Sequence, residues 1–107
     1  MKILLDECLP IDLRNSFPEH EANTVEWAGF KGKKNGDLLR AAENADYGVL
    51  LTVDQGIPQQ VSALGRKIAI VLLVAASNQL EDLLPLVPNV LVALQSIQPG
   101  QVVRLGR

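Results

Sequence analysis

The chain has few of the residues that build disulfides, thiolate metal sites or histidine metal sites. Its 107 residues include one cysteine, Cys8, and one histidine, His20. A single cysteine excludes an internal disulfide and a cysteine-rich zinc site, and a single histidine excludes a two-histidine metal motif. Nothing in the sequence supplies the third member or the oxyanion hole that a Cys8–His20 catalytic pair would need.

Aromatic residues, net charge and long apolar runs are also scarce. Only 4% of the residues are aromatic, so Leu, Val, Ile and Ala must fill the core. Lys and Arg number 10 against 12 Asp and Glu, so contact with RNA would need a local basic patch or a metal. The longest apolar run, 68–76, is at most half a membrane span, and the N-terminal run is too short for a signal peptide. We expect a single domain over residues 1–107, cytoplasmic and without a membrane contact.

Apolar runs alternate with helical patterns along the chain. The expected strands cover 3–5, 21–25, 47–53, 68–74 and 101–105. The expected helices cover 9–17, 35–45 and 80–97, and a polar connection over 55–65 has room for a short helix. Pro85 and Pro88 interrupt the last helix, which predicts two abutting helices or a kink. Continuous apolar strands are typical of a parallel sheet between helix layers. We predict a three-layer α/β/α fold with a mainly parallel sheet of about five strands.

Acidic residues stand where the expected strands end. Asp6 and Glu7 follow the first strand, and Asp54 follows the strand over 47–53. Asp37 opens a helix that runs antiparallel to the strands, so its first turn is level with their carboxyl ends. Because open parallel sheets bind ligands at this edge, the topology brings the carboxylates together there. Each acid alone also fits a turn, an N-cap or the helix dipole, so the hypothesis rests on their convergence.

Clustered carboxylates without histidine or cysteine are hard oxygen ligands, which suit Mg²⁺ or Mn²⁺. We therefore expect Asp6, Asp37 and Asp54, with Glu7, to bind such a cation. The cation would make a bound water a better nucleophile and would give phosphate oxygens a counter-charge. This chemistry is that of a phosphodiesterase.

Basic and polar side chains flank the expected site. Lys31, Lys33 and Lys34 lie in a glycine-containing loop and are candidates to hold phosphates, although a charged loop is also commonly just solvated. Ser77 and Asn78 follow the strand over 68–74, where they could cap a helix or, at its N-terminus, hold phosphate. We expect Trp27 and Phe30 to anchor the loop rather than to stack on bases.

Five segments together resemble a known family: MKILLDECLP, NGDLLRAA, LLTVDQG, GRKIAIVLL and SNQLEDLLPLVP. In this order they are similar to the small PIN-like proteins grouped under a domain-of-unknown-function label, over nearly the whole chain. PIN domains are α/β/α metal-dependent ribonucleases, and many are toxins of bacterial toxin–antitoxin pairs. The resemblance implies that Asp6, Asp37 and Asp54 are the acidic site residues, with Glu7 as a further candidate. Gln55 and Gly56 stand where PIN nucleases often carry a fourth acid, which leaves a one-metal or inactive enzyme open.

The sequence thus predicts a Mg²⁺- or Mn²⁺-dependent endoribonuclease, acting on RNA and toxin-like, with an antitoxin-like protein as partner. The helix expected over 80–97 also carries apolar residues outside its main apolar face, and these predict a homodimer. One alternative is a catalytically degenerate PIN-like module that acts by binding a protein. Another is a receiver-like phospho-acceptor domain, which needs a lysine at the end of its last strand. Near the only late strand of this chain stand Arg104 and Arg107 instead.

Overall fold

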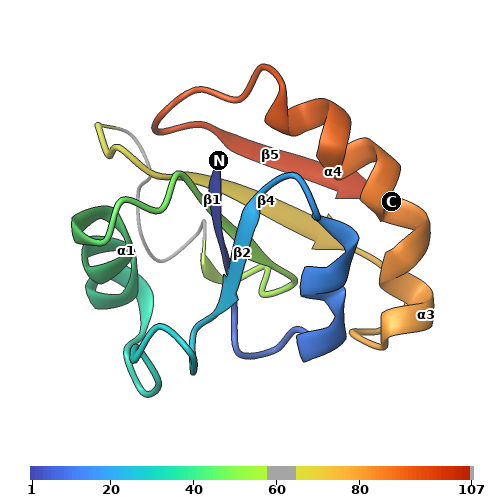
Figure 1. The fold of residues 1–107 in the computed structure, drawn as a ribbon, viewed down its shortest axis with the longest axis horizontal. Helices are drawn as coiled ribbons and strands as arrows, with labels where there is room; N and C mark the ends of the chain where they lie inside the picture. Colours follow the sequence, from blue (N-terminus) through green and yellow to red (C-terminus); the bar gives the residue numbers. More distant parts are fainter. Residues whose placement is uncertain (58–64, 107) are drawn as a thin grey trace.

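Five strands form one parallel sheet in the computed structural model, which describes residues 1–57 and 65–106 (Figure 1). The strands are β1 (Lys2–Leu5), β2 (Glu21–Thr24), β3 (Val49–Thr52), β4 (Ala69–Val74) and β5 (Val102–Gly106). Their order in the sheet is β2-β1-β3-β4-β5, and each neighbouring pair is parallel. The predicted parallel sheet is confirmed, with a strand at each of the five expected places.

Short helices connect the strands. They are η1 (Ile11–Ser16), α1 (Asn35–Asn44), α3 (Leu80–Leu83), η2 (Leu84–Leu86) and α4 (Val87–Leu94). The predicted break over 80–97 is confirmed: Pro85 lies in the 3-10 segment η2 and Pro88 in the first turn of α4. The first expected helix is a single 3-10 segment, and most of the connection expected over 55–65 lies outside the described residues. No helix of the described part is long and apolar enough to cross a membrane.

Alternate strand residues pack into two apolar cores, one on each face of the sheet. Leu4, Leu50 and Ile70 face the side of α1 and pack with its buried residues Leu38, Leu39 and Ala42. Ile3, Leu5, Leu51 and Val71 face the other side and pack with Leu13 and Phe17 of the η1 region, Leu83 of α3, and Val90 and Leu94 of α4. Figure 1 shows α1 on one side of the sheet and η1, α3 and α4 on the other, which confirms the three-layer architecture.

The chain reverses its direction across the sheet after β2. It runs from β1 outward to β2, and α1 then carries it back to β3 on the other side of β1. Such a switch point leaves a crevice at the carboxyl ends of the two strands, where doubly wound folds bind ligands. Asp6 follows β1 here, and its backbone N–H donates to the Leu51 carbonyl of β3 at 3.0 Å.

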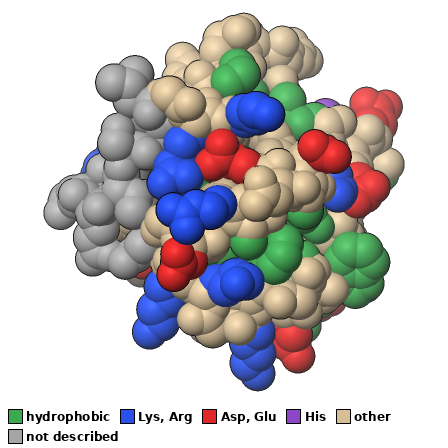
Figure 2. Space-filling model, turned by 90° about the vertical axis from the view of Figure 1, so that its left-hand side faces the viewer, with side chains coloured by type: hydrophobic (Ala, Val, Ile, Leu, Met, Phe, Trp, Pro, Cys, Tyr) green, Lys and Arg blue, Asp and Glu red, His purple; other side chains and the backbone are tan. Residues whose placement is uncertain are grey.

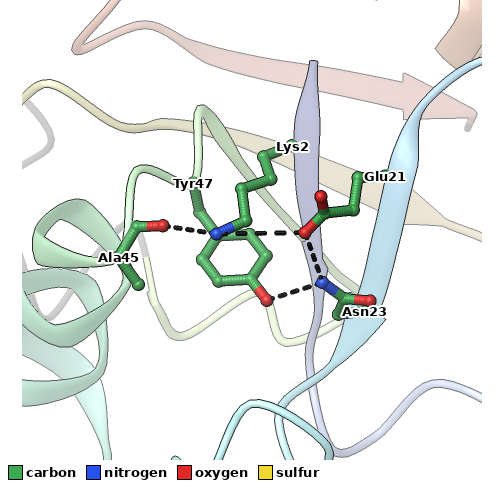
Figure 3. Close-up of polar contacts among 5 residues, drawn as sticks. All are labelled: Lys2, Glu21, Asn23, Ala45 and Tyr47. Carbon is green, nitrogen blue, oxygen red and sulfur yellow. Dashed lines mark hydrogen bonds and ion pairs between the residues drawn. The ribbon is translucent and has the colours of Figure 1, made fainter.

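The amino-terminal edge of the sheet carries a separate polar network around Lys2 (Figure 3). Lys2 Nζ donates to the Ala45 carbonyl at 2.6 Å and lies 4.5 Å from the centre of the Tyr47 ring. The Asn23 amide donates to Glu21 Oε2 and to the Tyr47 hydroxyl, both at 2.9 Å. The network ties β1, β2 and the end of α1 together, and none of the acids expected in the site takes part in it.

Candidate functional site

A pocket of about 410 Å³ lies at the carboxyl ends of β1 and β3, and we call it the acidic pocket. Its lining comes from three separate segments: Asp6, Glu7 and Cys8 after β1; Lys33, Lys34 and Leu38 around the start of α1; Val53, Asp54 and Ile57 after β3. Two of the three expected aspartates therefore meet here, together with Glu7 and two of the expected lysines.

Thr52, the last residue of β3, connects the two aspartates. Its side chain is fully buried, and its hydroxyl donates to Asp6 Oδ2 at 2.7 Å. The same hydroxyl oxygen accepts the Asp54 backbone N–H at 3.0 Å. Thr52 is not among the site residues expected from the sequence, although a hydroxyl that ends an otherwise apolar strand just before an acid is a usable signal. A single buried hydroxyl thus orients the Asp6 carboxylate and positions the start of the Asp54 turn.

A backbone N–H also bonds one oxygen of each aspartate carboxylate. Asp6 Oδ1 accepts the Glu7 N–H at 2.8 Å, and Asp54 Oδ1 accepts the Gly56 N–H at 2.9 Å. A carboxylate oxygen has two lone pairs, so each of these oxygens can accept a further ligand. The two carboxylates are therefore oriented in the pocket and still able to bind a cation.

Asp37 occupies a different position from Asp6 and Asp54. It lies in the first turn of α1, as expected, but it is not among the described residues that line the acidic pocket. Its carboxylate pairs with Arg40 at 3.7 Å, and its side chain is 77% exposed. Leu38, the next residue, provides that part of the lining. The role of Asp37 as a ligand stays a prediction.

Glu7 anchors the lysine-containing loop to the site. Glu7 Oε1 accepts the Gly32 N–H at 3.1 Å. Gly32 has φ +89°, a backbone conformation that favours glycine. Lys31 precedes this glycine and lines an adjoining pocket, whereas Lys33 and Lys34 follow it and line the acidic pocket. The bond to Glu7 thus fixes the loop at Gly32, with one expected lysine in the adjoining pocket and the other two in the acidic pocket.

Phe30 and Trp27 behave differently in this loop. Phe30 packs against the core on the α1 side and meets the Tyr47 ring edge-on, with 6.3 Å between ring centroids. The expectation that it anchors the loop is confirmed. The same expectation is wrong for Trp27, whose side chain is 67% exposed. The turns of this loop direct Phe30 toward the core and leave Trp27 in solvent. The composition of the loop alone does not decide which of the two aromatic residues is buried.

Cys8 lines the acidic pocket as a protonated thiol. Its Sγ lies 3.7 Å from both Asp6 Oδ2 and Thr52 Oγ1. Burial raises the pKa of the Cys8 thiol, the hydrogen bond with the Val53 backbone offsets part of this, and the Asp6 charge raises the pKa further. Because the thiolate is the nucleophilic form, a raised pKa makes Cys8 a poor nucleophile.

Ser77 and Asn78 use their side chains within the fold. Ser77 Oγ donates to the Asp82 carboxylate and accepts the Gln79 N–H at 3.0 Å, at the start of α3. Asn78 Nδ2 donates to the Cys8 carbonyl at 2.9 Å, which joins the loop after β4 to the loop after β1. Neither is among the described residues lining the acidic pocket, so their contact with phosphate stays a prediction.

The donor set fits a largely hydrated Mg²⁺ or Mn²⁺ ion. Within residues 1–57 and 65–106, no group of three or more His, Cys, Asp or Glu side chains is arranged to hold a metal. Mg²⁺, however, commonly binds through one or two carboxylates plus substrate phosphates and keeps several waters. Asp6 and Asp54 supply two such carboxylates in one pocket. These residues fit a hydrated cation and do not fit an all-protein metal cage.

Basic residues are concentrated beside the acidic pocket. The segment from Trp27 to Arg40 contains four basic residues and one acidic residue, although the whole chain has a net charge of −2. Figure 2 shows Lys and Arg side chains gathered on the face that includes the α1 side, interspersed with acidic ones. A local basic region of this kind is what nucleic-acid binding by an acidic protein requires.

Comparison of the chain with protein-family models, with curated proteins and with solved structures finds no match.

Proposed function

We propose that this protein is a Mg²⁺- or Mn²⁺-dependent endoribonuclease of PIN-like type, acting as the toxin of a toxin–antitoxin pair. One observation carries the proposal. Asp6 and Asp54 line the same pocket at the ends of two neighbouring strands, bridged by the buried Thr52 hydroxyl and flanked by Lys33 and Lys34. This combination joins hard oxygen ligands with cations that suit a phosphodiester.

The residues of the pocket have distinct roles in this proposal. Asp6 and Asp54 hold the cation, which when bound polarises the phosphate and lowers the pKa of a water. Thr52 keeps the Asp6 carboxylate in one orientation through its 2.7 Å hydrogen bond. Lys33 and Lys34 bind the phosphates on either side of the cleaved bond, as exposed lysines do with nucleic-acid backbones.

Cleavage of single-stranded RNA by purified protein with Mg²⁺, with Mn²⁺ or with EDTA tests the proposal. Asp54→Asn keeps the shape of the side chain but removes its charge, so it should abolish cleavage while the protein stays folded. The matched control is Asp12→Asn, an exposed aspartate of η1 that should leave cleavage unchanged. Millimolar Mn²⁺ should also raise the Tm of the wild type more than that of Asp54→Asn, because a native-state ligand stabilises the fold. Full activity in folded Asp54→Asn would contradict the site.

A binding module without catalysis is the second candidate. Asp37 pairs with Arg40 outside the pocket lining, and Gln55 and Gly56 provide no further carboxylate, both of which favour it. In this case the wild type binds RNA or a protein partner and cleaves nothing under any metal condition.

A receiver-like phospho-acceptor has one favourable feature, the strand order β2-β1-β3-β4-β5, which receiver domains share. Against it, β5 brings Arg104 and no lysine toward the carboxyl edge of the sheet within the described residues. Formation of an acyl-phosphate on Asp54 with a small phosphodonor would identify this function, and we expect none.

A further inference from the structure

A second pocket of about 340 Å³ adjoins the acidic pocket and shares Asp6 and Glu7 with it. We call it the adjoining pocket. Its lining combines four apolar residues, Leu9, Pro10, Ile11 and Val25, with five polar or charged ones, Asp6, Glu7, Thr24, Glu26 and Lys31. A volume at the lower end of the range for small-molecule sites, about 300–1,000 Å³, is suited to one compact ring system.

Large apolar side chains are exposed at this end of the molecule. Ile11, part of the pocket wall, is 58% exposed. Trp27 follows the pocket residue Glu26 in the chain and is 67% exposed, while its backbone N–H is held by Thr24 Oγ1 at 3.1 Å. Ile11 is thus an exposed apolar group in the pocket wall, which is typical of a binding surface. Trp27 is not among the described lining residues, but its backbone is held by the pocket residue Thr24, and a tryptophan on a fixed backbone offers a flat face for stacking.

The polar groups of the pocket are of three kinds. Asp6, Glu7 and Glu26 carry carboxylates that accept hydrogen bonds, Thr24 carries a hydroxyl, and Lys31 is a cation. Because Lys31 and Lys33 lie on opposite sides of Gly32, one loop directs a lysine to each pocket. The lysines suit the anionic phosphates of a nucleic-acid strand, and the carboxylates suit the hydrogen-bond donors on the edges of its neutral bases.

We propose that the adjoining pocket binds one unpaired base of an RNA strand whose neighbouring phosphate lies in the acidic pocket, with Trp27 stacking on that base. The inference rests on the proposed function and specifies its substrate as single-stranded. Leu9 and Ile11 contact the faces of the base, and Lys31 binds the adjacent phosphate. Glu26 accepts hydrogen bonds from the amino group of the base.

The carboxylates make the pocket selective among bases. Cytosine, adenine and guanine carry exocyclic amino groups that donate hydrogen bonds, and glutamate accepts from such groups. Uracil carries no amino group. The pocket therefore prefers cytidine over uridine, and this preference depends on Glu26.

Fluorescence anisotropy with labelled hexacytidylate and hexauridylate in EDTA tests the inference apart from catalysis. We expect hexacytidylate to bind at least about fivefold more tightly than hexauridylate, since a well-paired base contact discriminates by a factor of this order or more. Trp27→Ala should weaken binding of both oligomers at least about fivefold, the lower range for loss of a base stack. Glu26→Ala should remove the preference for cytidine. The matched control is Leu84→Ala, since Leu84 of η2 is also a large exposed apolar residue, at 44%, and is not among the described lining residues of either pocket.

The possible results distinguish the base-site proposal from the nuclease proposal. If Trp27→Ala and Glu26→Ala bind both oligomers like the wild type, the adjoining pocket is not the base site, whatever the cleavage assay gives. Equal affinity for double-stranded RNA of the same sequence, or no binding at all at tens of micromolar protein, also overturns the inference. If the oligomers bind through these residues but the wild type never cleaves RNA with Mg²⁺ or Mn²⁺, the base site stands and the nuclease proposal fails.

Discussion

The hydroxyl of Thr52 donates to Asp6 Oδ2 at 2.7 Å and thereby links the end of β3 to the first residue after β1. Thr52 is completely buried, so this bond is shielded from solvent and fixes the carboxylate in one orientation. The site thus consists of an acid from one strand and its positioning group from the next.

Thr52→Val tests this positioning role. Valine has nearly the same shape, but it cannot donate to Asp6 or accept the Asp54 N–H. We expect RNA cleavage to fall about 10- to 100-fold, the usual effect of losing a partner that orients a metal ligand. Thr52→Ser keeps the hydroxyl and should retain most of the activity. Wild-type cleavage by folded Thr52→Val would show that the hydrogen bond has no functional role.

The contacts of Glu43 predict that the protein loses folding stability in acid. Its Oε1 accepts a bond from Arg66 Nη1 at 2.8 Å, and its Oε2 accepts the Lys67 N–H at 2.9 Å. Burial alone would raise the pKa of Glu43, but the Lys67 N–H and the Arg66 bond and charge together hold the pKa below its ordinary value. The folded state therefore gains stability from ionised Glu43 above the ordinary carboxyl pKa of about 4.3 and loses it as the pH falls through the lowered value.

Urea unfolding as a function of pH checks this prediction. Glu43→Gln should lower the free energy of unfolding at pH 7 by about 1–2 kcal/mol, because a hydrogen bond to a charged group is lost. The difference from the wild type should shrink toward pH 3. Glu19→Gln, at an exposed position, is the matched control. An equal loss at both pH values would rule out ionisation of Glu43 as the cause.

Asp46 holds a strained backbone at the end of α1. Its φ is +67°, and the Asp46 and Tyr47 N–H groups donate to the Glu43 and Ala42 carbonyls, the pattern of a Schellman cap. Glycine adopts this conformation without a Cβ penalty, so Asp46→Gly should raise the free energy of unfolding by up to about 1 kcal/mol. Asp46→Ala should not stabilise the protein. A lower stability of Asp46→Gly in urea would contradict the expectation.

The predicted homodimer has a candidate surface on the side of α4. Val92 of α4 is 64% exposed, and Val102 of the edge strand β5 is 42% exposed. We expect light scattering at tens of micromolar protein to give the mass of a dimer, and Val92→Glu to give a monomer, because a charge opposes burial of this surface. A monomeric wild type would contradict the prediction.

Much of the fold was predictable because it depends on near neighbours in the chain. The apolar runs that form β1, β3 and β4 were recognisable, and Pro85 and Pro88 divide the last helical region as expected. The helix expected over 9–17 is limited to the 3-10 segment η1, which has no side-chain cap and stops before Pro18. Apolar patterns and helix-breaking prolines thus predicted the type of most strands and helices. The length of the helix expected over 9–17 was overestimated.

The sequence by itself determined that Asp6 and Asp54 follow apolar strands, because strand ends depend on local hydrophobicity and turn residues. Only the tertiary structure decided that β1 lies next to β3, and hence that Thr52 reaches Asp6. It also decided that Glu7 binds the Gly32 N–H and that Asp37 is not among the described residues lining the acidic pocket. Strand order arises from packing between residues far apart in the chain, and a one-dimensional pattern does not specify which strands become neighbours.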